Sequence, residues 1–150
     1  MLGTGRAKTG SGERDVPVDY QALARFRYEL RKFQAFSKSA AGQAGLTAQQ
    51  HQALLAVRGF SGAGGISVGD LARYLLIRHH SAVELVDRMS KLNFISRSVD
   101  GADSRRVLVN LTKEGERRLK KLSKIHQDEL RAIEPTLTQL LKRFRKSRRI

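Results

Sequence analysis

Residues 67–112 read SVGDLARYLLIRHHSAVELVDRMSKLNFISRSVDGADSRRVLVNLT, and this stretch decides the fold. Ser67 stands three residues before Asp70, which is the spacing of a helix start where a side-chain oxygen caps the first backbone amides. A second helix is predicted over about 79–91, because apolar residues recur there at steps of three and four. Residues 94–111 instead alternate with a period of two around an Asp-Gly pair, which predicts a β-hairpin. Two short helices followed by a two-stranded ribbon indicate a winged helix-turn-helix.

Longer helices are predicted on both sides of this stretch. Large apolar residues recur at helical steps over 19–42, and a capping box at Thr47 starts another helix that Gly59 is expected to stop. The C-terminal part of the chain forms a long helix that Pro135 interrupts and that a last helix continues. With Ile66 as a short strand residue, the chain is predicted to be mainly α with a small β-wing.

The helix-turn-helix requires particular residue types at and around its turn. Ala72 is small enough to let the two helices cross closely. Apolar residues are expected to point inward at Leu71, Leu75, Ile77, Ala82, Leu85, Val86, Met89 and Leu92. Leu76 stands where the tight turn favours glycine, and a left-handed backbone there costs leucine roughly 1 kcal/mol unless packing offsets it.

Composition limits the classes of protein that the chain can be. In 150 residues, 29 Lys and Arg stand against 14 Asp and Glu, for a formal net charge of +15, and no cysteine is present. Disulfides and thiolate metal sites are excluded, and four histidines leave little from which to build another metal site. No apolar run is long enough for a membrane span or a signal peptide, so a cytoplasmic protein is expected. The excess of positive charge predicts a polyanionic partner, most often nucleic acid.

One domain is expected after a short leader. Residues 1–17 are rich in Gly, Ser and Lys and have almost no large apolar groups, which predicts disorder. Residues 18–150 are long enough for a single domain with its own core. The positive charge is concentrated at its end, because residues 112–150 carry thirteen basic and five acidic side chains.

The most specific motif lies in the predicted hairpin. The run Asp103-Ser104-Arg105-Arg106-Val107-Leu108-Val109-Asn110-Leu111-Thr112 matches the pattern Asp-x-Arg-x-x-x-Val-x-Leu-Thr at every fixed position. This pattern is the wing signature of the multiple antibiotic resistance regulator (MarR) family of bacterial transcription regulators, and Leu71-Ala72 and Leu85-Val86-Asp87-Arg88-Met89 match that family's helix-turn-helix at the expected distance. The chain resembles this family over about residues 19–146. The resemblance implies a winged helix-turn-helix at 47–111 and a dimer formed through helices at 18–42 and 113–146.

The second helix of the helix-turn-helix is the predicted recognition helix. Steps of 100° per residue from Ala82 separate a buried side from an outward polar face, and the N-terminal end of that face reads bases in helix-turn-helix proteins. The predicted DNA contacts are Arg78, His79, His80, Ser81, Val83, Glu84, Arg88 and Lys91. Ser81-x-x-Glu84 is also the spacing of a capping box, which is the alternative role for Glu84. The opening Arg78-His79-His80-Ser81 departs from the Ser-Arg-Ser-Thr that is commoner in the family.

The predicted DNA-binding residues of the wing are Arg97, Asp103, Arg105 and Arg106. The resemblance assigns Arg105 to a minor groove, where narrow A·T-rich stretches concentrate negative potential. It also implies that Asp103 holds Arg105 or the wing base by a salt bridge. The alternative is that both side chains only fasten the hairpin.

The end segments carry apolar stripes more extensive than a winged helix needs to cover itself. The predicted dimer interface comprises Leu23, Phe26, Leu137, Leu140, Leu141 and Phe144, and intrachain core is the alternative. A two-fold dimer presents two recognition helices to a palindromic operator. The resemblance further implies a small aromatic effector bound between these helices and the winged domain. Its candidate contacts are Tyr28, Lys32, Phe36, His51 and Leu55, for which core packing or solvated surface is the alternative.

These observations predict a sequence-specific double-stranded DNA-binding transcription regulator. We expect a homodimeric repressor that is associated with the nucleoid and released by a small-molecule effector. A basic RNA- or ribosome-binding module is one alternative, and an effector-independent architectural DNA-binding protein is another. No catalytic triad, phosphate loop or dinucleotide-binding turn is found, so neither an enzyme nor a bound cofactor is expected.

Overall fold

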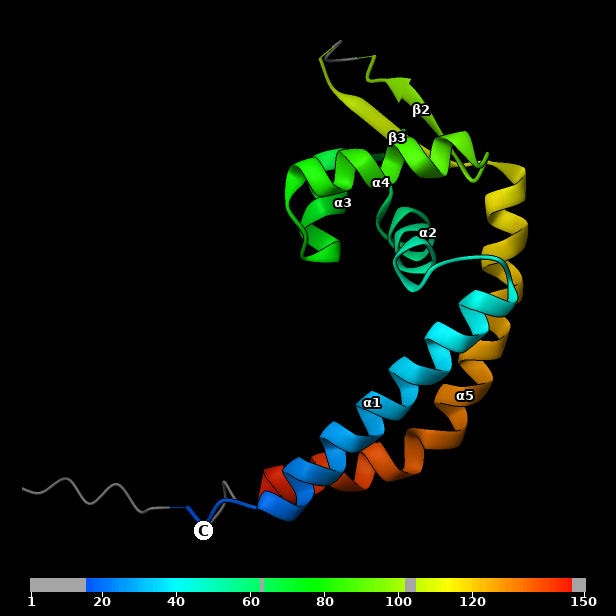
Figure 1. The fold of residues 1–150 in the computed structure, drawn as a ribbon. Helices are drawn as coiled ribbons and strands as arrows, with labels where there is room; N and C mark the ends of the chain where they lie inside the picture. Colours follow the sequence, from blue (N-terminus) through cyan, green and yellow to red (C-terminus); the bar gives the residue numbers. More distant parts are fainter. Residues whose placement is uncertain (1–15, 63, 102–104, 147–150) are drawn as a thin grey trace, which may run out of the picture.

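The computed structural model describes residues 16–62, 64–101 and 105–146, which form an arm joined to a winged body (Figure 1). The arm pairs helix α1 (Tyr20–Gln43) with helix α5 (Lys113–Lys146), and the two run side by side. The body holds helices α2 (Ala48–Phe60), α3 (Val68–Leu75) and α4 (His79–Lys91) with strands β1 (Ile66–Ser67), β2 (Ile95–Val99) and β3 (Val107–Leu111). The prediction of a mainly helical fold with a small β-wing is confirmed.

The three strands form one antiparallel sheet in the order β1-β3-β2. Val109 of β3 lies opposite Ile66 of β1 on one side and opposite Arg97 of β2 on the other. The Asp100 N–H donates to the Arg106 carbonyl at 2.8 Å, just before the wing tip. Because β1 runs directly into α3, the base of the predicted hairpin is fixed to the first helix of the helix-turn-helix.

The turn between α3 and α4 contains a strained leucine. Leu76 adopts the left-handed conformation with φ 55° and ψ 39°, as expected for a position that favours glycine. The Ile77 N–H donates to the Ala72 carbonyl at 3.0 Å, which fastens the turn to the end of α3. Since the Leu76 side chain is 91% exposed, no packing offsets its strain of roughly 1 kcal/mol.

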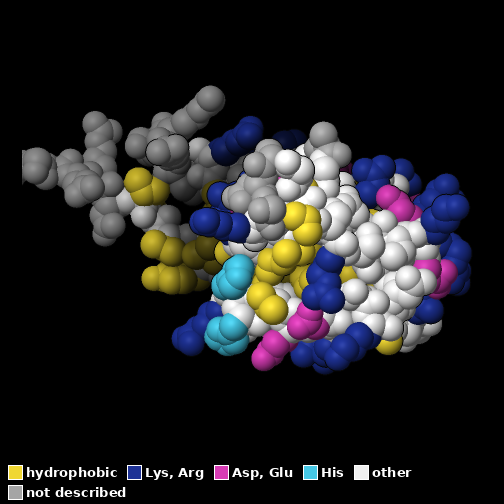
Figure 2. Space-filling model, turned by 90° about the horizontal axis from the view of Figure 1, so that it is seen from above, with side chains coloured by type: hydrophobic (Ala, Val, Ile, Leu, Met, Phe, Trp, Pro, Cys, Tyr) yellow, Lys and Arg dark blue, Asp and Glu magenta, His cyan; other side chains and the backbone are white. Residues whose placement is uncertain are grey.

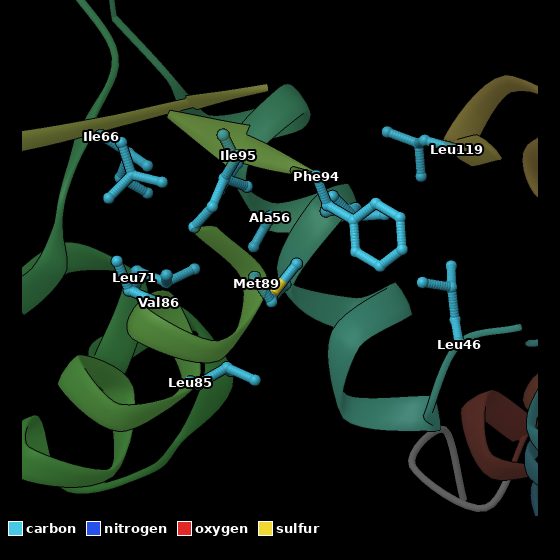
Figure 3. Close-up of a cluster of buried hydrophobic side chains, with 14 of the residues drawn as sticks. Leu46, Ala56, Ile66, Leu71, Leu85, Val86, Met89, Phe94, Ile95 and Leu119 are labelled. Carbon is cyan, nitrogen blue, oxygen red and sulfur yellow. The ribbon is translucent and has the colours of Figure 1, made fainter. Parts of the chain in front are cut away.

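The core of the body lies where α2, α3, α4 and the sheet meet (Figure 3). At most 1% of the surface is exposed for Leu54, Leu71, Leu85, Val86 and Met89. Full burial of one such side chain contributes about 1.5–3 kcal/mol, so this cluster is the main source of the body's stability. Helix α5 approaches it at Gly115, where a Cβ atom would lie 2.1 Å from the Phe94 carbonyl oxygen.

Three local predictions are wrong. Helix α2 continues through Gly59, because one helical glycine costs only about 1 kcal/mol and the following Phe60 ring stacks on Tyr74 with 3.8 Å between centroids. Pro135 lies inside α5 and does not divide it. The helix instead bends in its second half, as expected where a proline removes a backbone hydrogen bond (Figure 1). Leu92 is 51% exposed, because α4 has ended one residue earlier.

Two expectations concern segments that are only partly described. Of the leader expected over residues 1–17, only Val16 and Pro17 lie within the described residues. The wing tip at 102–104, which includes Asp103, lies outside them. No helix in the described ranges is long and apolar enough to cross a membrane.

Candidate nucleic-acid interface

Helix α4 buries one face and presents the other to solvent. Its buried side chains, at most 1% exposed, are Ala82, Leu85, Val86 and Met89. Its exposed side chains are His79, His80, Val83, Glu84, Arg88 and Lys91, and Ser81 is half-buried. The predicted orientation of this helix is confirmed, and its polar face is free to enter a groove of DNA.

Figure 2 looks onto the face that carries α4 and the wing. Histidine side chains lie beside a hydrophobic patch, with Lys and Arg side chains around both. A hollow on this face is lined by Val68, Val83, Val86 and Val107 and by Arg97, Arg105 and Arg106. Apolar groups that can meet a thymine methyl and cations that can meet phosphates therefore share one surface.

Helix α4 begins without a side-chain cap. Arg78 occupies the N-cap position in an extended conformation and makes no capping hydrogen bond. The Ser81-x-x-Glu84 capping box is wrong, because α4 starts at His79 and Ser81 already lies in its first turn. Within the described part of the chain, Glu84 has no hydrogen-bond or ion-pair partner, so its carboxylate is able to accept from a base edge. Uncapped backbone amides at a helix start attract anions such as phosphate.

Two ion pairs tie the wing to the helices beneath it. Arg97 of β2 donates to Asp87 of α4. Arg106, at the start of the returning strand, pairs with Asp70 of α3 at 3.5 Å. All four side chains are 41–50% exposed, so each pair contributes at most about 1 kcal/mol and a phosphate can replace the carboxylate.

These two carboxylates are functional residues that the sequence analysis missed. Asp70 and Asp87 lie 36 and 10 residues from their arginine partners, so that only the fold brings the charges together. Arg105 is exposed and lines the same hollow, and its predicted partner Asp103 lies outside the described residues. The wing is thus held by Asp70 and Asp87, one from each helix of the helix-turn-helix.

Comparison with known proteins shows which family the segment that carries this surface resembles. A family model described as the MarR family matches residues 44–106, which span α2, α3, α4 and β2. The winged-helix segment is therefore similar to the MarR family. The transcriptional activatory protein BadR of Rhodopseudomonas palustris is 41% identical over 71 residues, which are 47% of this chain and 41% of BadR. The chain thus matches less than half the length of this relative.

Solved structures extend the likeness beyond the MarR-family segment. The S. aureus MepR–DNA complex is similar with a TM-score of 0.68 at 20% identity, covering 88% of this chain and 94% of that one. NadR in complex with 4-hydroxyphenylacetate has a TM-score of 0.67 at 23% identity, covering 94% of each chain. At these identities the match shows a shared fold, and it includes the arm as well as the winged body.

The residues predicted for a MarR-type dimer divide into two groups. Leu140 is 5% exposed, and the Phe26 and Phe144 rings meet edge to face with 6.5 Å between centroids in the same chain. These three residues hold α1 against α5, and Leu137 is half-buried on the same arm. Leu23 and Leu141 are 45% and 52% exposed, so they are the ones able to contact a second copy.

The residues predicted for an effector pocket do not form one cluster. Tyr28 lies under Lys32 and Arg25, whose charged groups are 5.1 and 5.7 Å from its ring centroid. Both cations also pair with the buried Glu29, and their hydrogen bonds, that of Lys32 above all, hold the pKa of this carboxyl below its usual value. Leu55 is 45% exposed on α2.

Phe36 and His51 instead meet around His126 of α5, a residue that the sequence analysis did not select. The His126 ring centroid lies 5.4 Å from that of Phe36 and 4.6 Å from that of His51. His51 is 1% exposed, and neither of its ring nitrogens has a hydrogen-bond partner among the described residues. Burial, reinforced by the charge of His126, lowers the pKa of His51 to about 4. His126 is a single histidine on a helix, and no local pattern distinguishes it from a surface residue.

Proposed function

We propose that this chain is a sequence-specific double-stranded DNA-binding regulator of transcription that acts on the nucleoid as a binding protein rather than an enzyme. One observation carries the proposal: the uncapped start of α4, its exposed polar face and the wing arginines share a surface that Asp70 and Asp87 hold together. The solved complex of MepR with DNA has the same fold, and BadR is a transcriptional activatory protein, which supports this function.

In this proposal the N-terminal end of the recognition helix α4 contacts bases, and its C-terminal end contacts the phosphate backbone. Arg78 takes a guanine, Val83 a thymine methyl and Glu84 a cytosine amino group, while His79, His80 and Ser81 complete the reading end. Arg88 and Lys91 lie further along α4 and contact phosphates, which fixes the position of the helix without reading sequence.

Selection of binding sites from random duplex DNA tests this division. Arg78→Ala or His80→Ala is expected to weaken discrimination at particular base pairs by roughly 1–3 kcal/mol, because each removes a base contact. Lys91→Ala is the matched control on the same helix and is expected to weaken all duplexes alike. An unchanged sequence preference in both N-terminal variants contradicts the assignment. Tighter binding to structured RNA in a competition titration favours an RNA-binding module, and equal affinity for all duplexes favours an architectural protein.

The wing contributes a separate contact through Arg105, with Asp103 fixing its approach to the minor groove. Each subunit that loses one contact to a DNA phosphate releases about 0.9 fewer counterions on binding. In a dimer, Arg105→Ala is therefore expected to reduce the slope of log binding constant against log salt concentration by about 2. Arg106→Ala is the comparison variant, because Arg106 is the adjacent arginine and has to give up its pairing with Asp70 before it contacts a phosphate. Equal losses for the two arginine variants, with Asp103→Ala harmless, identify the wing as a diffuse electrostatic contact.

We infer a homodimer from the exposed leucines of the arm, because two recognition helices then face a palindromic operator. Leu141→Glu is expected to give folded monomers in sedimentation, since this side chain is half-exposed, and a persistent dimer contradicts this interface. We also infer repression, the result of occupying a promoter, whereas BadR is an activatory protein. Transcription in vitro from an operator-bearing template decides the sign: fewer transcripts on adding the protein support repression, and more assign activation.

Effector release is the last element of the proposal. NadR is solved with 4-hydroxyphenylacetate, and this chain shares its fold. The five predicted contacts do not form one pocket and His51 is buried, so an aromatic acid could reach Phe36 and His51 only if arm and body separate. Lys32, which lies one helical turn from Phe36 on α1, would then meet its carboxylate. In titration calorimetry 4-hydroxyphenylacetate is expected to bind, to lower operator affinity, and to bind less well to Lys32→Gln than to the control Lys38→Gln. Unchanged operator affinity at saturating ligand rules out this effector class.

A further inference from the structure

His51 and His126 meet where the winged body joins the arm. His51 belongs to α2 of the body and His126 to α5 of the arm, while α1 packs against both helices (Figure 1). The two imidazole rings lie 4.6 Å apart with their planes inclined by 45°. A movement that opens the junction at this contact therefore separates the two histidines.

The hydrogen bonds around the pair fit two neutral rings. His126 Nδ1 lies 2.8 Å from the Leu122 carbonyl oxygen, so this nitrogen carries the proton and donates it. His126 Nε2 lies 2.8 Å from Ser37 Oγ, and in the neutral ring protonated at Nδ1 it accepts from that hydroxyl. His51 has no partner for either nitrogen among the described residues, so a proton added to it would be buried without an acceptor.

No carboxylate is among the contacts of this pair in the part of the chain that the structure describes. Helix α1 contributes Ser37, Phe33 and Phe36, and α5 contributes Leu122 and His126. Among the described residues, the only charge that acts on His51 is the one that His126 carries when it is protonated, and that charge opposes a proton on His51. The nearest charged side chains in sequence on the arm, Lys38, Lys124 and Asp128, are exposed.

We propose that the His51–His126 pair is a proton-sensitive latch that holds the body on the arm, so that mild acid opens this junction and weakens DNA binding. The opening of the junction in mild acid is a property of the protein alone. The weakening of DNA binding rests on the proposed function, because a dimer binds an operator only if both winged bodies keep the spacing that the arms set. Gly45 between α1 and α2 has φ +74°, a conformation that allows the chain to turn sharply at the edge of the junction.

Linkage gives the sign and size of the effect. In the open state His51 reaches water and binds a proton below its ordinary pKa of 6.5, whereas burial in the closed state lowers its pKa to about 4. The latch is therefore fully effective above about pH 6.5 and weakens as the pH falls toward 4. Between these values the ratio of open to closed junction rises by up to tenfold per pH unit.

Hydrogen exchange of the α2 amides tests the latch without DNA. After correction for intrinsic exchange rates, wild-type α2 is expected to open up to tenfold more often at pH 5.5 than at pH 6.5. His51→Phe keeps an aromatic ring but cannot titrate, so its opening is expected not to change with pH. His79→Gln, which alters an exposed histidine, is the control and is expected to follow the wild type. The same pH response in His51→Phe and the wild type overturns the proposal.

Operator affinity measured by fluorescence anisotropy tests the functional half. From pH 6.5 to 5.5 at constant ionic strength, the affinity of the wild type is expected to fall up to tenfold relative to that of His51→Phe. His79 and His80 are present in both proteins, so their effect on DNA binding cancels in this ratio. A pH-dependent opening without a change in the ratio retains the latch and rejects its coupling to DNA. If phenylalanine overfills the site and the variant unfolds, His51→Leu provides the same comparison.

Discussion

Polar side chains have opposite surroundings on the surface formed by α4 and the wing and at the junction between arm and body. On the surface, Arg97 and Arg106 have carboxylate partners that solvent and phosphate can replace. At the junction, His51 is buried with no partner among the described residues, and only packing and the neutral form of the ring keep it there. Exposed ion pairs contribute at most about 1 kcal/mol, whereas a buried unpaired polar group costs about 1–3 kcal/mol. Substitutions on the surface should therefore change binding with little change in stability, and substitutions at the junction should do the reverse.

The largest expected effect is at the close approach between α5 and the body. A Cβ atom at Gly115 would lie 2.1 Å from the Phe94 carbonyl oxygen, so Gly115→Ala must displace backbone and is expected to destabilise the protein by about 3 kcal/mol. Gly69 of α3 is the matched control, because nothing lies within 4 Å of its added Cβ. Gly69→Ala is expected to stabilise by about 0.4–1 kcal/mol. Urea unfolding measures both, and equal effects would mean that the junction is not tightly packed.

The second effect is the acid sensitivity of the junction. Because the pKa of His51 falls from 6.5 to about 4 on folding, the free energy of unfolding is expected to decrease by about 3 kcal/mol as the pH falls through this interval. Hydrogen bonds from Arg117 and Arg118 lower the pKa of Glu114 from 4.5 to about 2, so the stability that this carboxylate contributes is complete above about pH 4.5 and is lost only as the pH falls below that value. Urea unfolding at several pH values should show a shallower slope for His51→Phe than for the wild type. Parallel slopes would assign the acid sensitivity to other groups.

The sequence predicted correctly those features that depend on residues close together in the chain. The recognition face follows from 100° steps around Ala82, and the hairpin follows from alternation in 94–111. Predictions failed where tertiary contacts outweigh local preference. Gly59 did not end α2, and Pro135 did not divide α5.

In the candidate site, the sequence predicted which element carries each arginine but not the residue with which it pairs. Sequence placed Arg97 and Arg106 in the wing, but their partners Asp87 and Asp70 come from other elements, so their anchoring role needed the fold. His126 was missed for the same reason, because 89 residues separate it from Ser37. The roles of individual residues toward DNA remain predictions.

A third prediction concerns the turn between α3 and α4. Leu76 is left-handed and almost fully exposed, so Leu76→Gly should relieve roughly 1 kcal/mol of strain without removing a packed side chain. The greater freedom of glycine in the unfolded chain offsets part of this gain. Leu76→Ala keeps the strain and is the control, expected within about 0.5 kcal/mol of the wild type. Thermal unfolding measures the difference, and a loss of stability in Leu76→Gly would show that this side chain has a packing role.

The smallest expected effect on stability belongs to the pair that fixes the wing. Arg97 and Asp87 are 46% and 45% exposed, so a double-mutant cycle with Arg97→Ala and Asp87→Ala is expected to give a coupling of about 0.2–1 kcal/mol in urea unfolding. If the pair positions the wing, each single variant should weaken operator binding similarly, although Asp87→Ala removes a negative charge near DNA and would by Coulomb's law alone strengthen it. The charge-swapped protein with Asp87→Arg and Arg97→Asp separates the two roles. Recovery of operator affinity in the swap shows that the ion pair acts through wing position. If Asp87→Ala instead tightens binding and the swap does not recover it, Arg97 acts directly as a phosphate contact, and Asp87 competes with DNA for it.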